Sequence, residues 1–470
     1  MKALLIYPPK QHMIKTNVPE FVDKETGSYP PLGLLYIAGF IQRNSSHEVE
    51  VLDTQAEGLD YVQIEEKIRE KRPDIVGIQV FTFTLIDAIL TAETVKKVSN
   101  NILVCFGGPH VNIYPEETIN IPEADFLIMG EGEIRFTRLL DALDKREGLM
   151  DIDGIIFKDN SRIIRTPLRG YIEDLDSIPF PARRLSPYKK YYSLLAKQTP
   201  VTTMITSRGC PFRCLFCGRP HLGKKFRARS AANVVDEIED SLKIGIREFF
   251  FYDDTFSVNR DRAYDICDEI LKRGLEVSWD VRTRIDTVDE GLLKRLKKAG
   301  CERIHYGVEA GTKEILNVLC KDIDLKKAKE IFKKTKDLGI TTLAYFMIGS
   351  PTETKDQILR TIDFAIELDP DFVHFSITTP FPATELYRLG LERGVLKKDY
   401  WREFASEPKK NFIPEMWEEN LSRDELSALL KFAYKRFYAR PCYIMKELAK
   451  VRDVRELLRK IKAGLNVIKS

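Results

Sequence analysis

Short apolar runs alternate with amphipathic segments over the first 145 residues of the chain. Five of these runs predict β-strands: Lys2–Tyr7, Glu48–Asp53, Ile75–Val80, Ile102–Phe106 and Phe126–Met129. They are rich in β-branched residues and almost continuously apolar, which is typical of strands buried on both faces of a parallel sheet. Residues 1–145 are therefore predicted to form a doubly wound α/β domain with helices on each side of its sheet.

A second series of strand-then-helix units runs from residue 201 to about residue 390. Its six predicted strands are Val201–Thr206, Glu248–Tyr252, Glu276–Val281, Arg303–Val308, Thr341–Ile348 and Phe372–Ile377. Charged amphipathic helices such as Arg360–Leu368 separate them. Six such units predict a partial (βα)6 relative of the eight-stranded barrel, in which reactive groups project from the carboxyl ends of the strands.

The pattern is weaker between these two series and after the second one. Residues 146–200 are interpreted as a linker that contains a small hairpin, formed by Ile155–Phe157 and Arg162–Thr166, and a proline-bearing connection. Residues 391–470 are predicted to form a helical C-terminal extension. At 470 residues the chain is too long for one ordinary core, which agrees with division into several domains.

The end of the chain is basic, with twelve lysines and arginines against three acidic residues between positions 431 and 470. Apolar and aromatic residues are interleaved with them: Phe432, Tyr434, Phe437, Tyr438, Leu457, Leu458 and Ile461. One interpretation is a helical region that lies on an anionic membrane surface or contacts an anionic substrate. The other is a pair of helices that caps the barrel and turns a solvated charged face outward.

The overall composition indicates a globular protein, with 43% hydrophobic and 31% charged residues and a formal net charge of +3. This balance gives no general signature of nucleic-acid binding, so no nucleic-acid partner is expected. No apolar run approaches the roughly 18 residues of a membrane span, and the N-terminus reads as a strand rather than a signal peptide. We therefore expect a cytoplasmic protein, with contact at a membrane surface only through the basic C-terminal helices.

Three of the eight cysteines are clustered, in a C-x3-C-x2-C loop formed by Cys210, Cys214 and Cys217. The other five are expected to be buried reduced thiols: Cys105, Cys267, Cys301, Cys320 and Cys442. The clustered thiols could bind zinc together with His221, or an iron–sulfur cluster with one iron left open. A large barrel does not need a metal staple, so the position of the loop after the first barrel strand favours the cluster.

This loop, which begins with Arg208-Gly-Cys-Pro, and the six βα units resemble the radical S-adenosylmethionine (SAM) superfamily. The first 145 residues resemble the Rossmann-like cobalamin-binding domain that is fused to one large class of it. The resemblance implies that Cys210, Cys214 and Cys217 bind three irons of a [4Fe-4S] cluster. SAM would chelate the fourth iron through its amino and carboxylate groups.

The resemblance also implies which residues contact SAM. Phe216 would pack near the adenine, and the backbone of Ile348 and Gly349 would line it. Asp253 and Asp254 would hold the amino group, since an ammonium prefers a carboxylate partner. Glu309 would accept hydrogen bonds from the ribose hydroxyls. Each of these carboxylates has an alternative role as an ordinary ion-pair partner at a strand end.

For cobalamin, the candidate contacts lie in the loops that follow the first-domain strands: Gly33, Gly107, Gly108, Gly130, Glu131 and Gly132. Glycines allow the backbone to approach a large ligand closely, although they also serve ordinary sharp turns. The Asp-x-His-x-x-Gly signature of one set of cobalamin proteins is absent, because Gln55 stands at the histidine position. Cobalamin would then be held without a protein imidazole, and His110, the one histidine expected at this edge, is not assigned to cobalt.

The resemblance implies an enzyme that cleaves SAM reductively and transfers a methyl group from methylcobalamin to an unactivated carbon. The basic, aromatic tail favours a hydrophobic, lipid- or isoprenoid-like substrate, and a reductase or other low-potential electron donor is implied as a partner. One alternative is a rearrangement or cyclisation with auxiliary cobalamin, and another is an enzyme whose first domain binds no cobalamin. A different class, a cobalamin- or metal-sensing protein with a Cys3His zinc site, also stays open. The sequence identifies no catalytic proton donor.

Overall fold

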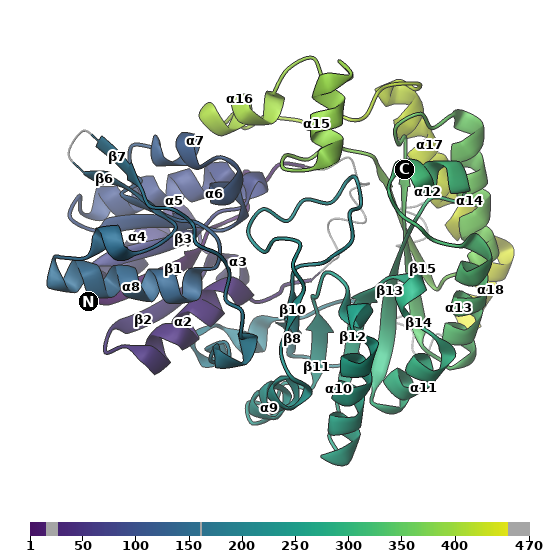
Figure 1. Cartoon of the computed structure of the whole chain (residues 1–470), viewed down its shortest axis with the longest axis horizontal. Helices are drawn as coiled ribbons and strands as arrows, with labels where there is room; N and C mark the ends of the chain where they lie inside the picture. Colours follow the sequence, from purple (N-terminus) through teal and green to yellow (C-terminus); the bar gives the residue numbers. More distant parts are fainter. Residues whose placement is uncertain (16–26, 160–161, 450–470) are drawn as a thin grey trace.

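The structure is a computed structural model that describes residues 1–15, 27–159 and 162–449. Two α/β units lie side by side, and a helical C-terminal region extends from the second unit over the first (Figure 1). Each unit contains a parallel sheet, as the apolar runs predict.

The first sheet has the strand order β2-β1-β3-β4-β5-β6-β7. Its strands are β1 (Lys2–Tyr7), β2 (Glu48–Asp53), β3 (Ile75–Gln79), β4 (Leu103–Gly107), β5 (Phe126–Ile128), β6 (Ile155–Asp159) and β7 (Arg162–Arg165). The first five are parallel, and their order reverses between β1 and β3. In doubly wound sheets, ligands bind beyond the carboxyl ends of the strands at such a switch point.

Helices cover both faces of this sheet. They include α2 (Leu32–Asn44) and α8 (Gly132–Lys145) on one face, and α4 (Tyr61–Lys71) and α5 (Leu85–Val98) on the other, with the short helices α3 (Thr54–Glu57), α6 (Pro109–Ile113) and α7 (Pro115–Ile119) in the connections. Alternate residues of β1 belong to different cores: Leu4 packs toward α4 and α5, and Leu5 toward α2 and α8. The prediction of strands buried on both faces is confirmed.

The hairpin predicted in the linker is present, but it is part of the first sheet. Its strands β6 and β7 pair with each other, and β6 pairs antiparallel to β5 through Phe126 and Phe157. The side chains of Ile155 and Ile156 are buried in the two cores of the first unit. This apolar pairing, rather than a free connection, accounts for the hairpin.

The second sheet contains six parallel strands in the order β15-β14-β13-β12-β11-β8. They are β8 (Val201–Met204), β11 (Glu248–Phe251), β12 (Ser278–Thr283), β13 (Cys301–Glu309), β14 (Thr341–Ile348) and β15 (Phe372–Ile377). The helices packed outside are α9 (Ala231–Leu242), α10 (Arg260–Lys272), α11 (Glu290–Lys298), α12 (Lys313–Val318), α13 (Leu325–Asp337) and α14 (Lys355–Leu368). The partial (βα)6 barrel is confirmed, with the third strand shifted two residues along the chain.

Helix α17 (Arg423–Tyr438) covers β15, the edge strand of the barrel. The hydroxyl of Tyr434 bonds to the backbone N–H and C=O of Phe375, and the hydroxyl of Tyr438 bonds in the same way to Val373. These aromatic residues therefore cap the barrel and satisfy an edge that would otherwise be open, which supports the second interpretation of the tail. Leu457, Leu458 and Ile461 lie outside the described residues.

The C-terminal region also packs on the first unit through α15 (Glu385–Glu392) and α16 (Tyr400–Ser406). Trp401 and Phe404 of α16 belong to the same buried core as Val111 and Ile119 of the first unit. In Figure 1, α15 and α16 pass above the space between the two sheets. The two units are thus joined at a second place, in addition to the 146–200 connection.

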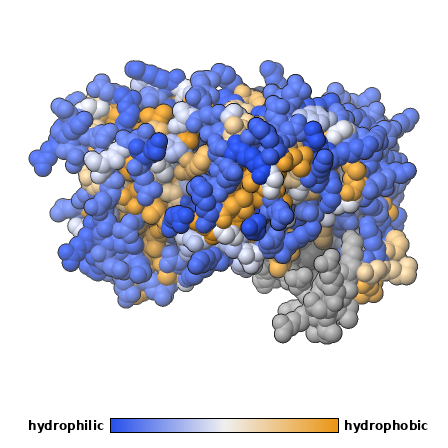
Figure 2. All heavy atoms as spheres, turned by 90° about the horizontal axis from the view of Figure 1, so that it is seen from below, coloured by the Kyte–Doolittle hydropathy of each residue, from blue (hydrophilic) through white to orange (hydrophobic). Residues whose placement is uncertain are grey.

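Hydrophilic side chains dominate the face of the molecule in Figure 2, and hydrophobic ones form smaller groups among them. Within the described residues, no helix combines the length and the apolar character that a membrane span requires. All eight cysteines are free thiols, but Cys320 and Cys442 are exposed rather than buried. Cys320 follows the short helix α12, and Cys442 lies in the first turn of the surface helix α18 (Pro441–Ala449).

Candidate active site between the two sheets

The three clustered cysteines lie on a loop that a short β-ribbon closes. Strand β9 (Ser207–Arg208) pairs antiparallel with β10 (Arg227–Ala228), and residues 209–226 form the loop between them. Figure 1 shows this loop above β10, in the middle of the molecule between the first unit and the barrel. Two backbone hydrogen bonds fix its centre, from Leu215 to Leu319 at 3.0 Å and from Leu386 to Leu215 at 2.9 Å.

Each sulfur of the three clustered cysteines has a polar neighbour. The Sγ of Cys217 is 3.3 Å from a guanidinium nitrogen of Arg219, and that of Cys214 is 3.8 Å from one of Arg284. The Sγ of Cys210, which is buried, is 3.6 Å from the hydroxyl of Thr255. Burial raises the pKa of the Cys217 thiol, and the charge of Arg219 offsets part of that shift. Metal ligation requires thiolates, and the positive charge of Arg219 opposes the effect of burial at Cys217.

The zinc alternative finds no support in the geometry. Within the described residues, no three histidine, cysteine or acidic side chains are arranged to hold a single metal ion. His221 is largely buried with its Nδ1 unbonded, and burial and the nearby Arg208 lower its pKa to about 4. The geometry therefore gives no support to the Cys3His alternative, and the three thiols of the loop are the soft donors that an iron–sulfur cluster requires.

Asp253 and Asp254, which follow β11, have different surroundings. The buried carboxylate of Asp253 accepts hydrogen bonds from the backbone N–H and the hydroxyl of both Thr206 and Ser207, at 2.5 to 3.1 Å. It therefore supports the start of the cysteine loop. Asp254 is exposed. Desolvation by the surrounding protein still raises the pKa of its carboxyl group, and the charge of Arg219 offsets part of that shift. This leaves Asp254 as the better candidate for the SAM ammonium.

Glu309 ends β13 in the left-handed region, with φ of 72°. Its carboxylate is 2.8 Å from the ammonium of Lys321, and both side chains are buried. A Cβ on Gly307 would lie 2.5 Å from this carboxylate and 2.8 Å from the ammonium, so the pair would have to shift if any other residue stood there. The alternative role of Glu309 as an ion-pair partner is thus realised, through one of its two carboxylate oxygens.

The proposed adenine contacts lie where several elements meet. Phe216 is partly buried and packs against the barrel core and against the cluster around Trp417. The carbonyl of Ile348 already accepts a hydrogen bond from Thr378 at 2.9 Å. Gly349 has φ of 73°, and a Cβ there would lie 2.6 Å from Leu426 of α17. Gly349 therefore allows α17 to approach, a role that the sequence pattern did not reveal.

Most of the first-unit glycines have structural roles. Gly108 and Gly130 adopt positive φ angles of 113° and 66°, and a Cβ on Gly132 would lie 2.8 Å from Ile37. Around Gly107, by contrast, nothing lies within 4 Å of an added Cβ, and at Gly33 the nearest atom is Nε2 of Gln79 at 3.6 Å. Gly33 and Gly107 therefore remain the glycines of this set whose positions fit close approach of a ligand.

Unpaired polar atoms lie near the same edge of the first sheet. Oε1 of Gln79, at the end of β3, and Nε2 of His110 are buried without a hydrogen-bond partner. Burial lowers the pKa of His110 to about 3, so its imidazole is neutral. Buried polar groups normally have partners, and a ligand rich in amides, such as cobalamin, could supply them. The residues at this edge therefore fit cobalamin.

A second histidine at this edge of the sheet is His12, in the loop after β1. Its Nδ1 is 3.0 Å from a carboxylate oxygen of Asp87, which also accepts a hydrogen bond from Tyr61 at 2.6 Å. The next residues of this loop reach the loop after β3, where Ile14 donates to the carbonyl of Phe83.

Glu131, predicted to contact cobalamin, is instead an ion-pair partner of the cysteine-loop ribbon. Its carboxylate is 2.7 Å from Arg208 and 2.9 Å from Arg227. Glu133 lies 2.5 Å from Arg208. Burial alone would raise the pKa of Glu131, but Arg208 and Arg227 together lower it below its ordinary value. The first unit and the cysteine loop are thus in direct, charged contact.

Comparisons with known proteins agree with this arrangement. Residues 204–365 match the Radical SAM superfamily, and residues 21–140 match the B12 binding domain. The chain is 36% identical to an uncharacterized methyltransferase of Pyrococcus horikoshii, over 95% of both chains. It is 30% identical to the anaerobic magnesium-protoporphyrin IX monomethyl ester cyclase of Rubrivivax gelatinosus, over 92% of this chain and 78% of that one.

A solved structure with a similar fold is that of the cobalamin-dependent SAM radical enzyme OxsB, with a TM-score of 0.76 at 17% identity, covering 99% of this chain and 72% of that one. Taken with the relatives, the two matched domains define the class: a radical SAM enzyme with an N-terminal cobalamin-binding domain. The chain belongs to the cobalamin-binding radical SAM family. Its cofactors are accordingly a [4Fe-4S] cluster, SAM and cobalamin.

Proposed function

We propose that this enzyme is a C-methyltransferase that modifies an unactivated carbon of a hydrophobic, lipid- or isoprenoid-like substrate. The observation that carries the proposal is the direct contact between the two cofactor domains, through Arg208 beside the cysteine loop and Glu131 beside the first-sheet edge. This contact supports the proposal that both cofactors serve one site. Similarity to the Pyrococcus methyltransferase supports the methyl-transfer outcome.

When bound, the cluster and SAM together supply a 5′-deoxyadenosyl radical that removes a hydrogen atom, and cobalamin supplies the methyl group. Cys210, Cys214 and Cys217 would hold the cluster, beside the positive charges of Arg219 and Arg284. Asp254 would pair with the SAM ammonium, and Glu309 would accept from the ribose hydroxyls. These two carboxylates would therefore orient SAM along the carboxyl ends of the barrel strands.

The test is a product analysis with anaerobically reconstituted protein. SAM labelled with deuterium in its methyl group would be incubated with a chemical reductant, hydroxocobalamin and a lipid extract of the cells that produce the protein. We expect a lipid that carries the labelled methyl group, formed together with S-adenosylhomocysteine and 5′-deoxyadenosine. Formation of 5′-deoxyadenosine without methyl transfer to any substrate would exclude the proposal.

A second candidate function is a radical cyclisation or rearrangement with auxiliary cobalamin. Similarity over 92% of the chain to the magnesium-protoporphyrin IX monomethyl ester cyclase favours it. This outcome would give 5′-deoxyadenosine and a product of unchanged methyl content. Absence of hydroxocobalamin binding by the reconstituted protein would instead indicate that the first domain carries no cofactor.

We further propose that α18 contacts an anionic membrane surface that presents the substrate. The exposed side chains of Ile444, Met445 and Leu448 on this helix support the proposal. Flotation with phosphatidylglycerol vesicles would test it, with Met445→Glu as the variant expected to lose binding. Equal flotation of both proteins would contradict it.

A further inference from the structure

The ribbon that closes the cysteine loop contains two like charges face to face. Arg208 of β9 and Arg227 of β10 are directly paired in register, and both are buried. Like charges opposite one another destabilise a strand pair, and a buried charge is costly unless it is paired. The ribbon therefore depends on counter-charges from outside itself.

The first domain supplies these counter-charges. Glu131 lies between the two guanidinium groups, 2.7 Å from Arg208 and 2.9 Å from Arg227, and Glu133 lies 2.5 Å from Arg208. The second carboxylate oxygen of Glu131 accepts the backbone N–H of Ile172 at 2.7 Å. The two carboxylates neutralise the two guanidinium groups. The buried charges of the ribbon are therefore paired only when the first domain is in place.

The connection from this ion-pair cluster to both cofactor ends is short along the chain. Glu131 directly follows Gly130 in the loop after β5, and Arg208 precedes Cys210 by two residues. Gly209, which lies between Arg208 and Cys210, has φ of 77°, and a Cβ there would collide with the carbonyl oxygen of Lys225. A shift of the ribbon would therefore be transmitted to Cys210 rather than absorbed.

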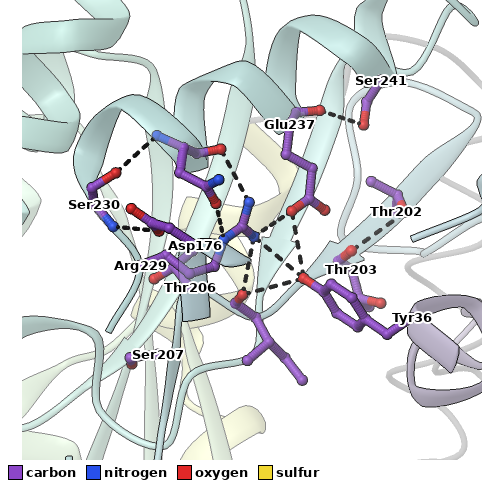
Figure 3. A network of polar contacts seen from close by, with 12 residues as sticks. Tyr36, Asp176, Thr202, Thr203, Thr206, Ser207, Arg229, Ser230, Glu237 and Ser241 are labelled. Carbon is purple, nitrogen blue, oxygen red and sulfur yellow. Dashed lines mark hydrogen bonds and ion pairs between the residues drawn. The ribbon is translucent and has the colours of Figure 1, made fainter. Parts of the chain in front are cut away.

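A second buried network holds the other side of the ribbon. Figure 3 shows the guanidinium of Arg229, which follows β10, directed at the carboxylate of Glu237 and at the hydroxyl of Tyr36 from α2 of the first domain. The other oxygen of Glu237 is 2.5 Å from Arg183. The ribbon is thus anchored to the first domain on both sides.

We propose that Glu131 and Glu133 are positioning residues that lock the cysteine-loop ribbon to the cobalamin domain and so set the separation between the cluster and cobalamin. The inference rests on the proposed function, because it requires both cofactors to serve one site. Since a misplacement of about 1 Å can cost about 100-fold in rate, such a lock would matter for transfer between the two cofactors.

The test uses the holoenzyme with cluster, cobalamin and SAM, and compares Glu131→Gln with the wild type. The first readout is the magnetic dipolar interaction between cob(II)alamin and the reduced cluster in electron paramagnetic resonance spectra. The second is the ratio of 5′-deoxyadenosine to methylated product. We expect a weaker or broader dipolar interaction and a ratio raised about tenfold or more, with iron and cobalamin contents unchanged.

Rescue and control variants separate positioning from general stability. The double variant Glu131→Gln with Arg227→Met removes one charge of each sign and should restore the dipolar interaction. Glu116→Gln, which breaks an exposed ion pair with Arg165 in the same domain, should change neither readout. If Glu131→Gln does not fold, Glu133→Gln, which leaves Glu131 between the arginines, provides the same comparison.

An unchanged dipolar interaction and an unchanged product ratio in both glutamate variants would overturn the positioning role and leave the proposed function standing. A wild type that binds both cofactors and makes no methylated product, but whose dipolar interaction still depends on Glu131, would overturn the proposed function and leave the positioning role standing. Failure of the wild type to bind cobalamin would overturn both.

Discussion

The carboxylate of Asp253 accepts the backbone N–H of Thr206 at 2.6 Å, which ties the end of the second barrel strand to the residue just before the cysteine-loop ribbon. Hydrogen bonds from the Thr206 hydroxyl and from Ser207 complete the contact. A carboxylate with four donors is better suited to holding the loop than to binding a ligand. Its neighbour Asp254 is exposed and is therefore better suited to binding a ligand.

Asp253→Asn replaces one accepting oxygen with a donor that faces other donors. We expect it to lower stability by about 1–3 kcal/mol and to reduce the iron content after reconstitution. Asp254→Asn is the matched control: it should retain the iron and raise the Kd for SAM by about tenfold. Iron analysis and SAM titration distinguish the two, and a fully loaded Asp253→Asn protein of normal stability would contradict the role assigned here.

Cys214→Ala should abolish cluster binding and SAM cleavage while leaving the barrel folded, because Cys214 is only partly buried and lies on a loop. Circular dichroism would report the fold, and iron and sulfide analysis the cluster. Cys442→Ala removes an exposed thiol on α18 and should change none of these quantities. Retention of SAM cleavage in the Cys214 variant would show that the loop is not the cluster site.

The Glu309–Lys321 pair gives two variants with different expected effects. Lys321→Met leaves a buried carboxylate unpaired and should destabilise the protein by about 3–5 kcal/mol, with SAM affinity changed little in the protein that remains folded. Glu309→Gln should weaken SAM binding by about 10-fold to 100-fold, because a charged acceptor for the ribose hydroxyls is lost. Equal SAM affinity in Glu309→Gln and wild type would leave Glu309 with the ion pair alone.

The sequence predicted the strands of both sheets well, because each strand is a local apolar run that must be buried. It did not predict the partner of the β6–β7 hairpin, since pairing to β5 is a tertiary choice. It also left two interpretations of the C-terminal tail, because an amphipathic pattern does not show what the apolar face contacts. For α17 that point is settled by the hydroxyls of Tyr434 and Tyr438, which bond to the backbone of β15.

The spacing of the three cysteines was enough to predict the cluster loop. The ion pairs that support this loop could not be predicted from the sequence. Glu131 reads locally as part of a glycine-rich loop, and its partners Arg208 and Arg227 are 77 and 96 residues away in the sequence. The same holds for Gly307 and Gly349, where a side chain would meet a distant residue that the local sequence does not reveal. Such requirements depend on which elements meet in space.

Glu353, in the loop after β14, should make stability depend on pH. Its side chain is 1% exposed, one oxygen accepts the N–H of Ser350 at 2.9 Å, and the other has no partner among the described residues. Burial raises its pKa from 4.5 to about 7. The folded protein therefore favours the protonated form. The contribution of this residue to stability is full below the unfolded pKa of 4.5 and is lost as the pH rises through about 7.

Glu353→Gln removes this titration while keeping an acceptor for Ser350. Relative to the wild type, the variant should gain stability between about pH 4.5 and pH 7, by up to about 3 kcal/mol, and the difference should stay constant above that range. Urea midpoints of both proteins across this range would measure the gain. The control is Glu367→Gln, on the following helix α14, which removes an exposed ion pair with Lys329 of α13 and should give a difference that does not vary with pH. A flat difference for Glu353→Gln as well would show that Glu353 is already ionised in the folded enzyme.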